Sequence, residues 1–149
     1  LIGVWGGARV SVRLSPNDSL QGCGDSDPDT LFATAARVLD DLGIGFLELR
    51  APGPDGTFSK AEGPSRVPLI RSAFKGPLVI NSDYDGAGAE AELRAGQADA
   101  ISFGRAYISN PDLVERIATG IAWADNIGAP QSWYSPGPAG YVDYPRATD

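Results

Sequence analysis

Short apolar runs alternate with longer amphipathic stretches along most of the chain. The runs have the length and composition of strands, while the stretches repeat apolar residues at helical spacing. Four strands are predicted in this way, at residues 9–14, 44–49, 78–80 and 100–103. A second element follows each strand: a helix at 28–42, a short helix or turn at 67–74, a helix at 86–95, and a helix from 110 to about 118.

The longest predicted helix has distinct boundary signals. Asp27 is a favourable N-cap residue, Pro28 suits the first helical position, and Gly43 follows the last apolar position. Between these ends, apolar side chains recur at helical spacing, at Leu31, Phe32, Ala35, Ala36, Val38, Leu39 and Leu42. By the same reasoning, Asn110 is expected to cap the last helix.

Four successive βα units predict a parallel α/β sheet. The first strand alternates polar and apolar residues, whereas the later strands are mainly apolar, as in strands covered on both faces. Two architectures stay open at this point: a small doubly wound sheet, and half of an eight-stranded barrel, which typically needs about 250 residues. Ligands bind at the carboxyl ends of parallel strands, so the polar groups there favour the half barrel. These groups are Arg13, Glu48, Arg50, Asn81 to Asp83, and Gly104 with Arg105.

A four-stranded half barrel has two unpaired edges and an uncovered inner face. Another chain or segment is therefore expected to complete it. We predict that residues 1–120 form the four βα units. Residues 121–149, which are rich in Trp, Tyr, Gly and Pro, are predicted to form an irregular tail.

Composition narrows the possible chemistry. The 149 residues contain no His, no Met and one Cys, and the net charge is −7. Without His, this chain has no His-based metal site, nucleophile pair or general base. The acidic balance argues against a nucleic-acid partner, and no apolar run is long enough to cross a membrane. The single Cys23 fits a reducing, cytoplasmic compartment, and the Met-less start at Leu1 suggests a piece of a longer protein.

Two loops at the predicted carboxyl ends are candidates for phosphate binding. In many barrels, phosphate is held by the loops after strands 7 and 8. If the chain is a C-terminal half, these loops contain Asn81, Ser82 and Asp83, and then Gly104 and Arg105. Glycine lets backbone N–H groups approach an oxyanion, and the arginine adds a bidentate cation. The alternative is an ordinary turn with a solvated arginine, and the Asp83 carboxylate would repel a phosphate unless it turned away.

Arg13 ends the first predicted strand and has two possible roles. At that position it would point toward the mouth of a barrel, where a ligand could meet it. It could equally form an ion pair with Asp18, Asp25 or Asp27, which follow in the next loop. The residues alone leave both interpretations open.

Seven short segments carry a resemblance to a known family. They are RLSP at 13–16, DSDP at 25–28, GIGFLELR at 43–50, ADAISFGR at 98–105, ISNPDL at 108–113, WY at 133–134 and GYVDYP at 140–145. In this order and spacing they resemble the old yellow enzyme family of FMN-dependent ene-reductases. They are most similar to bacterial reductases of the N-ethylmaleimide or 2-cyclohexenone type. The family folds as a (β/α)8 barrel with FMN at its carboxyl-end mouth, and the resemblance implies strands 5 to 8 and the tail.

The resemblance implies a role for each matched residue. Arg13 would lie beside the flavin N1 and C2 carbonyl and stabilise the anionic reduced flavin. The FMN phosphate would be held by Ser82 and Asp83, where many relatives have Gly-Gly or Gly-Asn, and by Gly104 and Arg105. Trp133 would pack near the dimethylbenzene edge of the flavin. The substrate pocket would be lined by Tyr134 and by Leu69 or Ile70.

The implied reaction is a hydride relay from NAD(P)H through FMN to an activated alkene. In the family, the residues that anchor the substrate and the tyrosine that protonates it lie in the first half of the barrel, and they have no counterpart here. The resemblance therefore implies no catalytic residue in this chain and a complementary N-terminal half-barrel as its partner, without which the chain is inactive. The alternative is a non-catalytic half barrel that self-associates and binds FMN or another phosphate ligand.

Overall fold

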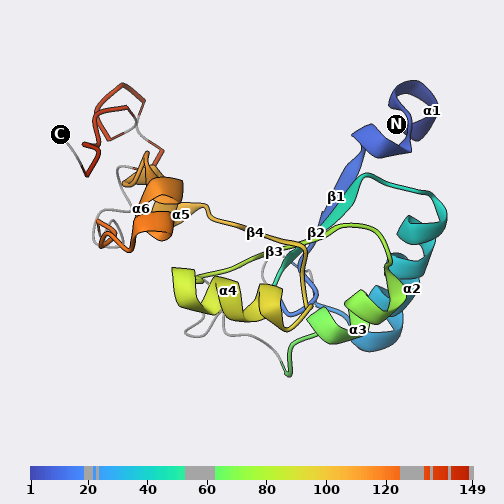
Figure 1. Cartoon of the computed structure of the whole chain (residues 1–149). Helices are drawn as coiled ribbons and strands as arrows, with labels where there is room; N and C mark the ends of the chain where they lie inside the picture. The colour runs from blue at the N-terminus through green and yellow to red at the C-terminus, as the bar shows by residue number, and fades with distance from the viewer. Residues whose placement is uncertain are drawn as a thin grey trace. The chain divides into compact units, whose positions relative to one another are not determined.

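The computed structural model describes residues 1–18, 22, 24–52, 63–124, 133–134, 136–140 and 142–147. The chain divides into two compact units, Leu1–Ser102 and Phe103–Asp149. The first unit contains the sheet and the helices connected to it, and the second contains two short helices (Figure 1). Each unit is described by itself below.

The first unit is built on a four-stranded parallel sheet in the order β1-β2-β3-β4. Its strands are β1 (Ser11–Leu14), β2 (Phe46–Arg50), β3 (Leu78–Asn81) and β4 (Ala100–Ser102). The predicted parallel α/β sheet is therefore confirmed. A doubly wound sheet reverses its strand order at a switch point, and this sheet does not, so that alternative is wrong.

Three helices connect the strands: α2 (Pro28–Asp41), α3 (Val67–Ala73) and α4 (Gly86–Arg94). Local capping explains where the longer two begin. The Asp27 carboxylate accepts a hydrogen bond from the Thr30 N–H at 3.2 Å, as the N-cap prediction requires. Asp85 caps α4 in the same way through the Gly88 N–H, at 2.7 Å. Gly43 follows α2 with φ 62°, a left-handed conformation that suits glycine.

The core of this unit lies on one face of the sheet. Leu47 and Leu49 of β2 are fully buried, and their register partners in β3 are Leu78 and Ile80, which are also fully buried. The buried side chains of the helices belong to the same unit: Phe32 and Ala36 of α2, Val67 and Ile70 of α3, and Ala89 of α4. Helices α2 and α3 pack against each other.

The alternate residues of each strand point to the opposite side, here called the exposed face. Its members are all exposed or half-buried, and they are Ser11, Arg13, Phe46, Glu48, Arg50, Val79, Asn81, Ala100 and Ser102. Charged and amide side chains at the carboxyl ends of the strands therefore lie together on this face.

Two short elements precede the sheet, α1 (Ile2–Trp5) and the 3-10 turn η1 (Gly7–Arg9). The first strand begins at Ser11, two residues later than predicted, because Arg9 belongs to η1. None of the helices in the described parts of the chain combines the length and the apolar character that crossing a bilayer requires.

The second unit contains α5 (Arg105–Ile108) and α6 (Leu113–Thr119). The prediction that Asn110 caps the last helix is wrong: α6 begins at Leu113 and its N-cap residue is Asp112, without a side-chain capping bond. Asn110 instead bonds to backbone groups outside α6. Gly120 ends the helix in a left-handed conformation, φ 71°.

Candidate functional site

A closed set of polar contacts links all four strands on the exposed face. The Arg13 Nη2 donates to Asn81 Oδ1 at 2.8 Å, and its Nε lies 3.7 Å from Glu48 Oε1. Asn81 Nδ2 donates to the backbone carbonyl of Ser102 at 2.7 Å. The Ser102 hydroxyl donates to Glu48 Oε1 at 2.9 Å, which completes the set. We call these four residues the strand-end network.

The strand-end network shows which carboxylate pairs with Arg13. None of the three loop carboxylates is its partner, and Asp18 instead pairs with Arg50. The Arg13 side chain is 52% exposed, and among the described residues it makes one hydrogen bond and one ion pair. A guanidinium has five N–H donors, so Arg13 keeps donors that a ligand could use.

Asn81 has a different place from the one expected of a phosphate-loop residue. Both ends of its amide are engaged inside the sheet, by Arg13 and by Ser102. Ser82 and Asp83 lie in the turn between β3 and α4, and both are half-buried. Tyr84 follows them and is buried, and burial, with the charge of Glu92, raises its pKa from 10.0 to about 12.

In the second unit, two predicted cofactor residues contact each other. The Arg105 guanidinium carbon lies 5.7 Å from the centroid of the Trp133 ring, within the range of a cation–π interaction. Gly104 is the N-cap residue of α5, and a Cβ built on it would meet no atom within 4 Å. The neighbouring Tyr134 is 92% exposed.

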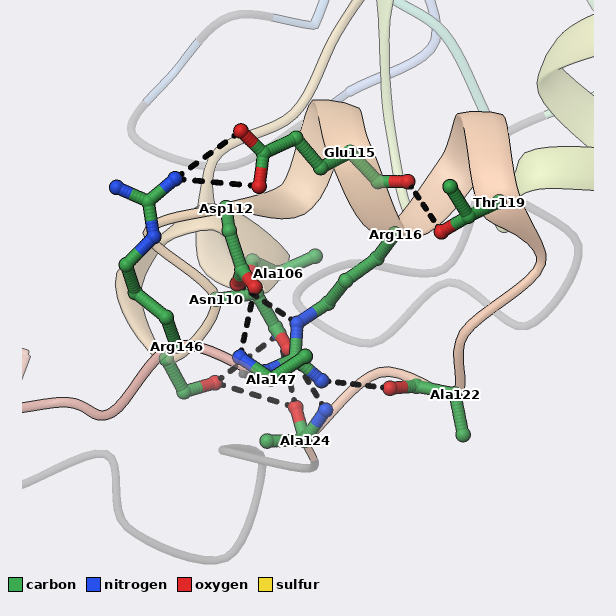
Figure 2. A network of polar contacts seen from close by, with 11 residues as sticks. Ala106, Asn110, Asp112, Glu115, Arg116, Thr119, Ala122, Ala124, Arg146 and Ala147 are labelled. Atoms are coloured by element: carbon green, nitrogen blue, oxygen red, sulfur yellow. Dashed lines mark hydrogen bonds and ion pairs between the residues drawn. The ribbon is translucent and has the colours of Figure 1, made fainter. Parts of the chain in front are cut away.

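A second polar network ties the tail to the helices of this unit (Figure 2). Asn110 is fully buried, and its Nδ2 donates to the carbonyls of Ala106 and Ala124 at 2.7 and 3.0 Å. Its Oδ1 accepts from the Ala124 N–H at 2.7 Å. The side chain thereby replaces backbone pairing for a segment fourteen residues further along the chain.

Asp112 and Arg116 hold the end of the tail. The Arg116 Nε donates to Asp112 Oδ1 at 2.7 Å, and the Arg116 Nη1 donates to the carbonyl of Ala122. The other carboxylate oxygen, Asp112 Oδ2, accepts from the Ala147 N–H at 2.8 Å (Figure 2). The Ala147 N–H and the Arg116 guanidinium hold the pKa of the Asp112 carboxyl below its ordinary value of 3.8. Nearby, Arg146 pairs with Glu115 at 3.1 Å.

The remaining predicted site residues lie in helix α3. Ile70 is fully buried in the core of the first unit, and Leu69 is half-buried beside it. Cys23 lies outside the described residues. Within the parts of the chain that the structure describes, no group of three His, Cys, Asp or Glu side chains is placed to hold a metal ion.

Sequence reasoning missed two parts of these networks. Ser102 received no role, although the alternation of Ala100 and Ser102 along β4 places both on the exposed face. The Asp112–Arg116 pair was also missed, although opposite charges four residues apart are a recognised helix signal. Spacing therefore gives the face of Ser102 and the Asp112–Arg116 pair, whereas it does not give the contact of Ser102 with Glu48 or the contacts to Ala124 and Ala147.

Known proteins resemble the chain over almost its whole length. Residues 3–123 match the model of the NADH:flavin oxidoreductase / NADH oxidase family. The "Probable flavin mononucleotide-dependent alkene reductase" of Leishmania infantum is 33% identical over 140 residues, which are 94% of this chain and 36% of the relative.

Two solved structures extend the comparison. The old yellow enzyme homologue from Zymomonas mobilis is 46% identical with a TM-score of 0.91, over 97% of this chain and 40% of that one. Morphinone reductase is 34% identical with a TM-score of 0.88, over 99% of this chain and 39% of that one. The chain thus spans less than half the length of each of these proteins.

Proposed function

The chain belongs to the NADH:flavin oxidoreductase / NADH oxidase family, and from this premise we propose that it forms the FMN-binding half of an ene-reductase. The resemblance to the old yellow enzymes is confirmed by these matches. The proposed substrates are C=C bonds activated by a carbonyl or nitro group, as in enones, maleimides and nitroalkenes. The observation that carries the proposal is the Arg13 guanidinium, held by Asn81 at the carboxyl end of β1.

Arg13 fits the cofactor in charge and in hydrogen-bonding capacity. The chemistry that FMN supplies when bound is hydride transfer between NAD(P)H and the alkene. The pyrimidine edge of a flavin presents carbonyl and ring-nitrogen acceptors, and Arg13 is a half-exposed cation with donors beyond its bond to Asn81. A fixed cation at that edge stabilises negative charge there without reorganising.

The loops after β3 and β4 are proposed to bind the FMN phosphate. Ser82 and Asp83 would offer backbone N–H groups, with the Asp83 carboxylate turned away from the anion. Gly104 and Arg105 would add a close backbone approach and a bidentate cation. The open space beside Gly104 and the position of Arg105 over Trp133 support this assignment.

The tail is proposed to line the site above and beside the flavin. Trp133 would pack near its dimethylbenzene edge while it contacts Arg105. The exposed Tyr134 would line the substrate pocket, together with Leu69 of α3, whereas Ile70 is fully buried in the core and has no surface left for a substrate. The proposal assigns no proton transfer and no covalent step to any of these residues.

We assign the chain to strands 5 to 8 of a (β/α)8 barrel. The two outer strands β1 and β4 each pair with one neighbour in this sheet, and polar residues occupy the exposed face. Both outer strands need a further neighbour to close a barrel, and a complementary N-terminal half-barrel is the proposed partner. Substrate anchoring and proton donation are assigned to that partner, and the isolated chain is expected to be inactive.

Complementation tests the proposal directly. This chain would be mixed with the segment of the Zymomonas mobilis homologue that precedes the matched region, and FMN would be added. We expect flavin absorbance to co-elute with the pair and NADPH to reduce 2-cyclohexenone or N-ethylmaleimide. Neither half alone should turn over.

Size-exclusion chromatography of the mixture also tests the alternative function, a non-catalytic binding module. A homodimer of this chain that binds FMN and turns over nothing, with or without the added half, would identify a non-catalytic binding module. Absence of both bound flavin and turnover in the mixture would refute the proposed function.

A further inference from the structure

We propose that Glu48 and Asn81 are positioning residues that orient Arg13, and that Glu48 also sets the reduction potential of the flavin beside it. This inference rests on the proposed function. It concerns residues of the strand-end network that belong to neither the phosphate loops nor the substrate pocket. The roles follow from the contacts that these two side chains make.

Asn81 acts as a rigid acceptor for Arg13. Its Nδ2 is bound to the Ser102 carbonyl at 2.7 Å, which fixes the amide plane against β4. The opposite atom, Oδ1, then faces β1 and accepts from Arg13 Nη2 at 2.8 Å. The Asn81 side chain therefore links the position of Arg13 on β1 to the position of β4.

Glu48 acts on the other end of the guanidinium. Its Oε1 lies 3.7 Å from Arg13 Nε, so the planar group is restrained at Nε and at Nη2. Contacts at two nitrogens fix the orientation of a planar guanidinium, whereas a single contact does not. The same Oε1 accepts from the Ser102 hydroxyl at 2.9 Å, and this contact holds the carboxylate on the exposed face.

The carboxylate also balances the charge that a ligand would meet. The Glu48 side chain is 22% exposed, so water and salt screen it less than they screen a surface carboxylate. A ligand at Arg13 would therefore experience a cation partly compensated by an anion within 4 Å. Negative charge that develops on a reduced flavin is then stabilised less than it would be by Arg13 alone.

Removing this compensation has a predicted sign. Glu48→Gln keeps an oxygen that can accept from Ser102 but loses the charge. The oxidised–reduced equilibrium of the bound flavin should shift about tenfold toward the reduced form, which is about 30 mV for a two-electron couple. The matched control is Glu90→Gln in α4, where the exposed Glu90 pairs with Arg94 and, among the described residues, with no other cation.

Two measurements test the inference on the chain and on the completed protein. In the first, the chain without flavin is labelled with 15N and the exchange of the Arg13 Nε–H and Nη–H protons is followed by NMR. Asn81→Ala and Glu48→Gln should each speed that exchange at least several-fold, and Glu90→Gln should leave it unchanged. Equal exchange in all variants overturns the positioning role.

The second measurement is the midpoint potential of FMN in the complemented protein. A rise in Glu48→Gln but not in Glu90→Gln supports the role of Glu48, and an unchanged or lower potential overturns it. A protein that binds no flavin refutes the proposed function instead, while the NMR measurement still decides whether Glu48 and Asn81 position Arg13. Circular dichroism of each variant verifies that the sheet has formed.

Discussion

Arg13 donates to Asn81 at 2.8 Å across the intervening strand, since β2 lies between β1 and β3 in the sheet. On β2, the register partner of Arg13 is Glu48, and its Oε1 lies 3.7 Å from Arg13 Nε. A contact of this kind connects strands that share no backbone hydrogen bond. It makes the orientation of a candidate flavin-binding cation depend on the packing of the whole sheet.

Asn81→Ala should destabilise the first unit modestly. It removes a hydrogen bond from Arg13 and another to the Ser102 carbonyl, and each half-exposed bond contributes on the order of 0.5–1.5 kcal/mol. Urea unfolding should therefore show a free energy of unfolding lower by about 1–2 kcal/mol. Ser82→Ala, one residue later in the turn, is the control, and an equal loss in both variants would contradict the assignment.

Arg105→Ala should weaken FMN binding in the complemented protein. The guanidinium is proposed to hold the phosphate, and hydrogen bonds to charged groups are worth about 1.5–3 kcal/mol, so we expect the Kd to rise on the order of tenfold to a hundredfold. Fluorescence titration of the flavin measures the Kd. Arg94→Ala removes the same charge from the surface of α4 and should leave it unchanged.

Asn110→Ala should release the tail from the second unit. The buried amide satisfies two carbonyls and one N–H, and these would lose their protein partners. We expect faster hydrogen exchange at the Ala124 amide and a loss of about 1–3 kcal/mol in the stability of this unit. Asn110→Asp keeps the acceptor for Ala124 and should retain more of its protection; equal protection in wild type and Asn110→Ala would count against this role.

Acid should detach the end of the tail only at low pH. The pKa of Asp112 is lowered in the folded chain by the Ala147 N–H and by Arg116. A lowered pKa stabilises the fold above the unfolded value of 3.8, and that contribution is lost as the pH falls through the folded value. The Ala147 amide shift in NMR should therefore be constant at neutral pH and change only below 3.8. Asp112→Asn should abolish this pH dependence.

Alkali should affect the loop that contains Ser82 and Asp83. Burial raises the pKa of Tyr84 from 10.0 to about 12, so the folded state favours the neutral phenol. That stability is fully present below pH 10 and is lost as the pH rises toward 12. The difference between the ultraviolet titrations of wild type and Tyr84→Phe should show one phenol that ionises near pH 12. A difference centred near pH 10 would mean that the phenol is not buried.

Local signals in the sequence predicted the order and type of the main elements. Asp27 and Pro28 begin α2 as expected, because a cap forms between residues only three apart and needs no distant partner. The same type of reasoning failed at Asn110. Its local pattern resembles a cap, but its side chain bonds to Ala124, which folding brings close from fourteen residues away.

A series of βα units with polar groups at the strand ends is predictable from the residues alone, because hydrophobic period and capping act over a few residues. Which of those polar groups meet depends on how the strands are arranged in the folded sheet. Arg13 had several carboxylates near it along the chain, and the pairing register of β1 with β2 placed Glu48 beside it instead. Register and strand order depend on the packing of a whole sheet, which no single stretch of sequence specifies.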